Sequence, residues 1–222
     1  LARERFVVTG TGRYLRNVEL APERNIGFIE INPDGDAYRI LWGFEPDGRP
    51  TSELPSHLHS HAVIKDVTGN DAHAVVHTHS PNLIALTYAI ADLTTARLTR
   101  LLWQMHAECI VVFPNGVEFI PWEMAGSTDI ADRTADALRS RTLALWEHHG
   151  IVGTGKNLDE ALGRIYVAEK AAGIYLDAMA AGGIKKSFST DQLAAIAANF
   201  NCTPDPAAMN VDVSPLFSRS TP

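Results

Sequence analysis

Cysteine is scarce in this sequence, and so are long apolar runs. Cys109 and Cys202 are the two cysteines among 222 residues, too few for the disulfide framework that stabilises small secreted domains. No apolar run approaches the ~20 residues of a membrane-spanning helix, and the first six residues lack the apolar region of a secretory signal. We therefore expect a protein of the reducing cytoplasm that has no membrane partner.

An excess of positive charge is also lacking. Lys and Arg number 19 against 26 Asp and Glu, which gives a formal net charge of −7. A broad nucleic-acid surface needs clustered basic residues, so the balance argues against nucleic acid as a partner. A local pocket can still bind a small anion against the overall charge. The chain begins at Leu1 without an initiator methionine, and we expect a further N-terminal segment in the full protein.

What is present fits one globular α/β domain. Hydrophobic residues make up 45% and charged residues 20% of the chain, which is ordinary for such a domain. We expect Trp103 and Trp122 to lie in its core and the Pro-rich tail after Cys202 to be irregular. Hydrophobic periodicity and turn residues predict the elements. The expected strands are 5–9, 26–31, 38–44, 74–79, 109–113, 117–122 and 143–148, and the expected helices begin near 52, 82, 129, 157 and 189. Strands mixed with helices predict a mixed sheet covered by helices.

Histidines are the most informative residues. His77 and His79 end an apolar strand in the pattern His-x-His, and residues two apart on a strand point to the same face. His148 and His149 follow a second apolar strand, so one of them can supply a third imidazole. Three neutral imidazoles with one open position are the usual form of a catalytic zinc site. The spacing does not decide between His148 and His149.

A competing group of histidines lies in the helix expected from Ser52. His57, His59 and His61 follow one another at every second position. His57 and His61 are four residues apart and can face the same side of a helix. The zinc-protease signature His-Glu-x-x-His is absent, because Leu58 follows His57. We interpret this group as a polar helix face with a structural role.

Two further segments have both a plain and a functional interpretation. Glu53 lies in the stretch TSELP at the expected start of a helix. There it can serve as a favourable partner of the helix dipole or as a general base. The stretch Thr9–Gly12 contains Gly-x-Gly after a strand, which is weak evidence for phosphate binding.

A nucleotide-binding loop is the alternative from a different functional class. Residues 150–157 contain Gly-x4-Gly-Lys between a strand and a helix. Asn157 stands where a P-loop needs Ser or Thr to bind magnesium. We therefore favour Asn157 as a helix N-cap, with Glu160 three residues later.

Several stretches carry a resemblance that covers nearly the whole chain. They are residues 7–12 (VVTGTG), 40–43 (ILWG), 51–57 (TSELPSH), 77–79 (HTH), 82–88 (NLIALTY), 108–114 (ECIVVFP) and 149–150 (HG). With these stretches the chain resembles the class II sugar-phosphate aldolases of the aldolase II/adducin-like superfamily. Within that superfamily it is most similar to the branch that cleaves L-rhamnulose 1-phosphate.

The resemblance implies a role for each matching residue. His77, His79 and His149 match the ligands of one zinc ion per subunit, and Glu53 matches the catalytic glutamate. Glu108 matches a second acidic residue that reaches the active site from a neighbouring subunit. The matching phosphate-binding positions are Thr11 (a serine in the family), Gly12, Thr51 and Ser52.

The same resemblance implies the reaction and the assembly. A phosphorylated ketose would be cleaved reversibly to dihydroxyacetone phosphate and L-lactaldehyde, as in rhamnose degradation. Residues 1–222 would form one class II aldolase-like domain, with a mainly antiparallel central sheet covered by helices on both faces. The enzyme would be a homotetramer with active sites between subunits. The family carries a further N-terminal segment that completes the phosphate pocket, and we expect it to precede Leu1.

Related activities remain alternatives at this level. A fuculose-phosphate aldolase, a ribulose-phosphate 4-epimerase or a dehydratase can use the same three-histidine site, so the products must distinguish them. A non-catalytic relative resembling adducin would keep only the fold. The presence of all three histidines and Glu53 argues against that last alternative.

Overall fold

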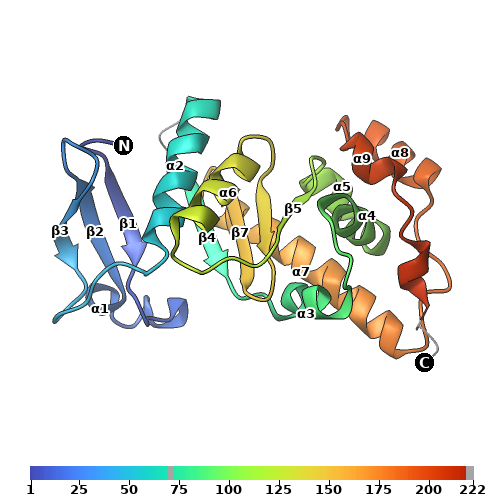
Figure 1. The fold of residues 1–222 in the computed structure, drawn as a ribbon, viewed down its shortest axis with the longest axis horizontal. Helices are drawn as coiled ribbons and strands as arrows, with labels where there is room; N and C mark the ends of the chain where they lie inside the picture. The colour runs from blue at the N-terminus through green and yellow to red at the C-terminus, as the bar shows by residue number, and fades with distance from the viewer. Residues whose placement is uncertain (70–72, 219–222) are drawn as a thin grey trace.

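The computed structural model describes residues 1–69 and 73–218, and its strands form two separate sheets (Figure 1). The first sheet has the order β1-β2-β3 and the second the order β4-β7-β6-β5. The strands are β1 (Arg5–Thr9), β2 (Ile26–Ile31), β3 (Tyr38–Gly43), β4 (Ala74–Thr78), β5 (Val117–Ile120), β6 (Leu143–Trp146) and β7 (Gly150–Gly155).

Helices separate most of these strands, and the named elements that follow β7 are all helices. They are η1 (Leu15–Asn17), α1 (Pro22–Asn25), α2 (Leu54–Thr68), α3 (Pro81–Ala89), α4 (Thr95–Met105), α5 (Glu108–Val112), α6 (Thr128–Leu138), α7 (Leu158–Ala180), α8 (Thr190–Asn199), α9 (Pro206–Asn210) and η2 (Ser214–Phe217). None of the helices within the described residues is both long enough and apolar enough to cross a lipid bilayer.

The first sheet is an antiparallel meander, and the expected hairpin of its second and third strands is confirmed. Ile29 and Ile31 point to its buried face, where they pack with Phe44 and with Leu54 of α2. Alternation along β2 places Phe28 and Glu30 on the opposite face. This sheet therefore rests on the start of α2, directly beside Glu53.

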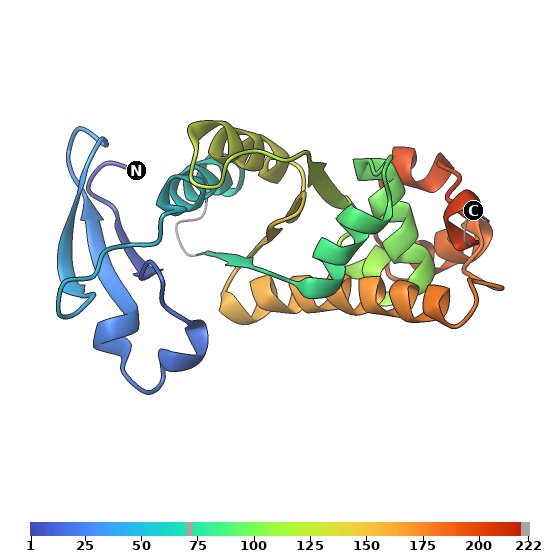
Figure 2. The same ribbon diagram turned by 60° about the horizontal axis from the view of Figure 1, so that its bottom comes forward.

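The second sheet is mixed and is buried on both faces. Its neighbouring strands are antiparallel, except that β5 and β6 are parallel. Leu143 and Leu145 of β6 pack on one side with α3, α4 and α7. Ala144 and Trp146 pack on the other side with α2 and α6. Figure 2 shows the long α7 along one side of this sheet and the pair α2 and α6 on the other. The expected mainly antiparallel sheet with helices on both faces is thus confirmed.

Close contact between β7 and α7 requires glycine at two positions of the strand. A Cβ atom at Gly153 would lie 2.7 Å from the Ile165 side chain, and one at Gly155 would lie 2.5 Å from the backbone nitrogen of Ala161. Both distances are shorter than a carbon atom tolerates, so the backbone of β7 can approach α7 only without side chains there. Asn157 then begins α7, because its side chain accepts a hydrogen bond from the Glu160 N–H, as predicted.

Five expectations from the sequence are corrected by the structure. Residues 109–113, predicted to be a strand, lie largely in the short helix α5. Helix α4 is absent from the predicted elements, and the tail contains α9 and η2 rather than only irregular chain. Ser52 does not cap α2, because that helix begins after Glu53 and has no side-chain cap. Trp122 is 59% exposed rather than buried, whereas Trp103 lies in the core as expected.

Candidate metal centre and active site

The pair His77 and His79 lies at the end of β4, near the middle of the molecule. His77 is the fourth residue of the strand, and His79 follows directly after its end. Their rings face the same space, with ring centroids 5.2 Å apart. The His77 ring also stacks on the buried Trp146 at 4.6 Å, which fixes its orientation. The apolar strand therefore carries two imidazoles to one point, as the His-x-His spacing predicts.

The turn between β6 and β7 contains both candidates for the third histidine, and one of them lies beside His77 and His79. The ring of His149 lies 5.0 Å from His77 and 4.9 Å from His79, centroid to centroid. His148 has a positive φ of 57°, and its ring stacks on Tyr88 at 4.0 Å. The Nδ1 atom of His148 lies 3.0 Å from the Thr87 hydroxyl. Of the two candidates, His149 is the one that the structure brings to the pair.

Glu53 completes the group. One of its carboxylate oxygens lies 3.3 Å from Nε2 of His77 and the other 3.3 Å from Nε2 of His149. The four residues Glu53, His77, His79 and His149 each offer a ligand atom, and these atoms lie within 4.8 Å of one another. Glu53 is 24 residues from His77 in the sequence and belongs to the segment that leads into α2, so the packing of α2 against the second sheet creates this proximity.

The protonation of His77 suits metal binding. Nδ1 of His77 lies 3.2 Å from the carbonyl oxygen of Ile151 and can donate its proton there. Nε2 is buried and makes no hydrogen bond within the described part of the chain, although Glu53 is at ion-pair distance. Burial lowers the pKa of His77 to about 4, so its ring is neutral near pH 7. A buried lone pair on Nε2, beside two further imidazoles and a carboxylate, fits a divalent ion such as zinc.

Glu53 is an anion in this environment. Burial by itself would raise its pKa, but the hydrogen bond from His149 and the electrostatic interactions with His77, His149 and His57 outweigh that effect. The net result is a pKa below the ordinary value for glutamate. A charged carboxylate next to a metal-binding group can act as a proton acceptor for a bound substrate.

The expected phosphate-binding residues come from two segments that the structure places side by side. The Thr11 N–H donates to the carbonyl of Arg49, and the Thr51 N–H donates to the carbonyl of Thr9. Gly12 has a positive φ of 66° in the turn after β1. Thr11, Gly12, Thr51 and Ser52 therefore lie in adjoining stretches of backbone that lead directly to Glu53.

The competing histidines of α2 do not form a second metal group. Nδ1 of His59 lies 2.8 Å from a carboxylate oxygen of Asp132, and Nδ1 of His61 lies 2.7 Å from Nε2 of His73. His57 lies close enough to Glu53 for their charges to interact, and burial lowers the pKa of His57. The three rings thus have different surroundings within the described residues, and their structural role stays a prediction.

Two other sequence candidates are separate from this group. Glu108 begins α5 and is exposed, and its carboxylate approaches Nε2 of His106 at 3.8 Å. It is not one of the four clustered residues. Residues 150–155 form the strand β7, whose backbone pairs with β4 and β6. That backbone cannot wrap a phosphate group, so the nucleotide-loop alternative is not supported.

Two supporting residues escape the sequence patterns. Trp146 contacts the rings of both His77 and His149, and the apolar strand pattern identifies it only as a core residue. Glu169 of α7 accepts hydrogen bonds from the N–H groups of Asn82 and Leu83 at the start of α3, at 2.9 and 3.0 Å. No local sequence signal links Glu169 to a helix 86 residues away.

Three comparisons with known proteins indicate the same family. The sequence profile described as "Class II Aldolase and Adducin N-terminal domain" matches residues 1–176. A rhamnulose-1-phosphate aldolase of Yersinia pestis (strain Pestoides F) is 45% identical over 210 residues, which is 95% of this chain and 76% of that protein. A crystal structure of a sugar-phosphate aldolase from Thermotoga maritima is 30% identical with a TM-score of 0.71, over 82% of this chain and 76% of that one. An L-fuculose 1-phosphate aldolase, 20% identical with a TM-score of 0.60 over 89% of this chain and 80% of that one, shares the fold.

Proposed function

Because the chain belongs to the class II aldolase and adducin family, we propose that it is a zinc-dependent lyase that cleaves L-rhamnulose 1-phosphate to dihydroxyacetone phosphate and L-lactaldehyde. The observation that carries the proposal is the convergence of Glu53 with His77, His79 and His149 within 4.8 Å. The 45% identity to a rhamnulose-1-phosphate aldolase over 95% of the chain supports the choice of substrate.

His77, His79 and His149 would hold the metal, one ion per subunit. Zinc bound there would supply a Lewis acid that stabilises negative charge developing next to the substrate carbonyl. The Ile151 carbonyl and the Trp146 ring hold His77 so that its Nε2 faces the other ligands. Three neutral nitrogen ligands leave the charge of the ion largely available to an anionic substrate.

Glu53 would carry the proton at the carbon next to the ketone. In the synthetic direction its carboxylate removes that proton, and in cleavage the protonated acid returns it. The lowered pKa keeps Glu53 charged before substrate binds. Its position 3.3 Å from two of the imidazoles supports this role, because a substrate bound beside them would lie close to the carboxylate.

Thr11, Gly12, Thr51 and Ser52 would bind the phosphate group. The support is that their two backbone segments adjoin through the pairing of Gly10 with Pro50 and lead directly to Glu53. Hydroxyl and backbone N–H groups are suitable donors to a phosphate that already carries its own charge.

Glu108 would exchange the proton of the substrate hydroxyl in the active site of a neighbouring subunit, within a homotetramer. Its exposed position at the start of α5, apart from the four clustered residues of its own chain, supports a role in trans. Trp122 and Tyr88 are 59% and 70% exposed, and aromatic side chains of this kind are frequent in subunit interfaces.

The direct test is the release of dihydroxyacetone phosphate from L-rhamnulose 1-phosphate, followed with a coupled dehydrogenase. We expect release that stops when a chelator removes the metal and returns when zinc is added. L-fuculose 1-phosphate serves as the competing substrate in parallel assays. Faster cleavage of the fuculose ester, or no cleavage of either ester by the zinc-loaded full-length protein, would contradict the assignment.

Replacement of the proposed base separates binding from chemistry. Glu53→Gln keeps the size of the side chain but cannot accept the proton, so we expect turnover to fall by about 10²–10⁴-fold. Zinc content, measured by atomic absorption, should remain close to one per subunit. Glu19→Gln, which alters an exposed glutamate, is the matched control. Wild-type turnover in Glu53→Gln would remove Glu53 from the role.

A further inference from the structure

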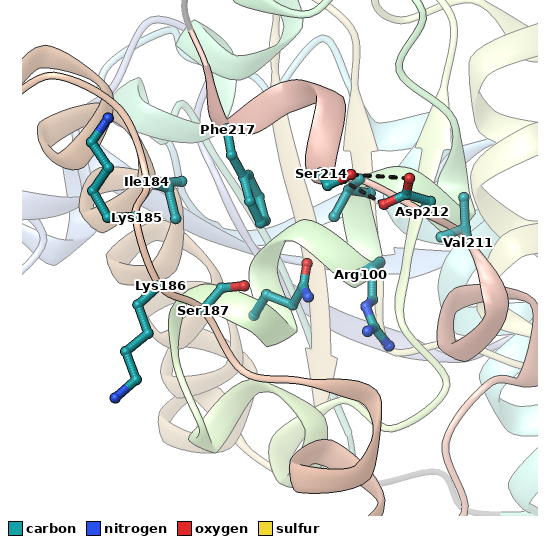
Figure 3. Close-up of a pocket in the computed structure, with 11 residues that line it drawn as sticks. Arg100, Ile184, Lys185, Lys186, Ser187, Val211, Asp212, Ser214 and Phe217 are labelled. Atoms are coloured by element: carbon teal, nitrogen blue, oxygen red, sulfur yellow. Dashed lines mark hydrogen bonds between the residues drawn. The ribbon is translucent and has the colours of Figure 1, made fainter.

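A second cavity lies at the C-terminal end of the described chain, apart from the histidine cluster. Its volume is about 280 Å³, and it is bordered by α4, by residues 184–187 and by residues 211–217. Figure 3 shows Ile184 and Phe217 side by side at this cavity, with Ser187 and Arg100 contributed by separate segments of the chain. None of the residues assigned to the proposed active site borders it.

Arg100 gives this cavity its chemical character. The side chain is buried, with 5% of its surface exposed. One terminal nitrogen donates to the carbonyl of Met209 and the other to the hydroxyl of Thr190, while Nε has no hydrogen-bond partner in the described residues. No acidic group of the described chain lies within ion-pair distance of this guanidinium. Asp212 interacts with Arg100 through its charge but forms no ion pair with it. A buried positive charge without a hydrogen-bonded anionic partner is unfavourable, and a bound anion would supply that partner.

The surroundings of Arg100 are also positive and rich in polar groups. Lys185 and Lys186 border the cavity, and Asp212 is the one acidic residue among its described lining residues. Asp212 uses its two carboxylate oxygens to accept hydrogen bonds from the N–H and the hydroxyl of Ser214. Burial lowers the pKa of Arg100 despite the opposing charge of Asp212. The local balance is therefore positive within a chain whose formal net charge is −7.

The cavity has room for a second polar contact and for a short apolar part of a ligand. Ser187 borders the cavity and carries a hydroxyl group that can donate a hydrogen bond to an anion. Ile184, Val213 and Phe217 contribute an apolar wall. In Figure 3 the ammonium groups of Lys185 and Lys186 point away from Arg100, so these two lysines act at the rim of the cavity.

We propose that this cavity is a binding site for a small phosphate-bearing ligand, separate from the active site. Arg100 and the rim lysines attract the phosphate, and the hydroxyl of Ser187 borders the same cavity and can donate a hydrogen bond to the phosphate. Arg100, Lys185 and Lys186 against Asp212 leave an excess of two positive charges among the described lining residues. This excess matches a phosphate dianion better than a monocarboxylate. A volume near the lower end of the ~300–1,000 Å³ range of ligand pockets favours inorganic phosphate or a short organic phosphate.

The test uses the full chain labelled with ¹³C in the methyl groups of isoleucine and valine. Ile184 and Val213 border the cavity and report binding directly. Inorganic phosphate, glycerol 3-phosphate and succinate are titrated separately into the metal-free protein. A shift of both methyl signals with the phosphate compounds supports the proposal, and the comparison of the two distinguishes free phosphate from an organic phosphate. No shift at millimolar concentration, or a shift with succinate alone, would overturn it.

Variants separate ligand binding from a purely structural role of Arg100. Arg100→Lys keeps the charge but loses the forked donors, and we expect the dissociation constant to rise about 10-fold. Ser187→Phe fills the cavity without changing charge and should abolish the methyl shifts even if the arginine variant does not fold. Lys186→Ala should weaken binding about threefold at low salt, whereas the exposed control Lys156→Ala should not. Unchanged binding in both Ser187→Phe and Arg100→Lys contradicts the proposal.

Discussion

Glu169 joins the long helix α7 to the start of α3, and its replacement tests whether this contact supports the strand end that carries the proposed metal ligands. The carboxylate accepts hydrogen bonds from the N–H groups of Asn82 and Leu83. Leu83 is completely buried, so water cannot replace its partner if the side chain is removed. Helix α3 begins two residues after His79, and the contact therefore holds the segment that carries this ligand.

The size of the effect follows from these contacts. A hydrogen bond to a charged group contributes about 1.5–3 kcal/mol, and a carboxylate at a helix N-terminus contributes about 0.3–1 kcal/mol. Because the Asn82 N–H is only half-buried and water can partly satisfy it, we expect Glu169→Ala to lower the free energy of unfolding by about 2–4 kcal/mol. Glu169→Gln retains one acceptor oxygen and should lose roughly half of that amount.

Urea denaturation of the metal-free protein measures this loss, and a competition assay with a zinc-binding dye measures metal affinity. We expect zinc affinity of Glu169→Ala to fall about 10-fold, in the range found when residues that orient metal ligands are replaced. Asp177→Ala, at an exposed position on the same helix, is the control. A loss below about 0.5 kcal/mol, or one equal to that of the control, would refute the reasoning.

Two further predictions concern histidines. His149→Ala should abolish stoichiometric zinc binding, because His149 is one of the clustered imidazoles. His148→Ala should keep it, because His148 contacts Thr87 and Tyr88 instead. The zinc content after dialysis measures the difference, and the reverse result contradicts the assignment. Burial, with the nearby charges of His73 and His57, lowers the pKa of His61 to about 3, so the unfolded chain binds a proton below pH 6.5 that the folded chain does not. The contribution of His61 to the free energy of unfolding should therefore be fully present above pH 6.5. It should fall toward pH 3 by at most about 1.4 kcal/mol per pH unit. His61→Gln should flatten this dependence in urea titrations at pH 7 to 5, and an unchanged dependence would contradict the assignment.

Sequence patterns predict elements well where local and tertiary preferences agree. The apolar residues of β6 and the Asn157 cap of α7 are examples. Residues 108–112 are the opposite case: the run ECIVV is rich in β-branched residues, but Cys109 and Ile110 pack into a helical core between α7 and α8. Tertiary packing overrides a weak local preference over so short a segment. Helix α4 does carry a usable signal, with Thr94 as its cap and Leu98, Leu101, Leu102 and Met105 at helical spacing.

The candidate site likewise has features that the sequence predicts and features that it does not. The spacing of His77 and His79 on a strand predicts that they share a face, and the structure confirms it. The choice of His149 over His148 depends on the φ of one turn residue, which no spacing reveals. Glu53 joins the cluster only through the packing of α2. Its role rests on resemblance to a family, because the local sequence also fits a simple helix N-terminus.

The glycines of β7 have a consequence for anyone who diversifies this enzyme to change its aldehyde specificity. Any side chain at Gly153 or Gly155 would push α7 away from the sheet, and Glu169 on that helix would then move away from the start of α3. Library members altered at these two positions would therefore lose folded protein before they could gain a new activity.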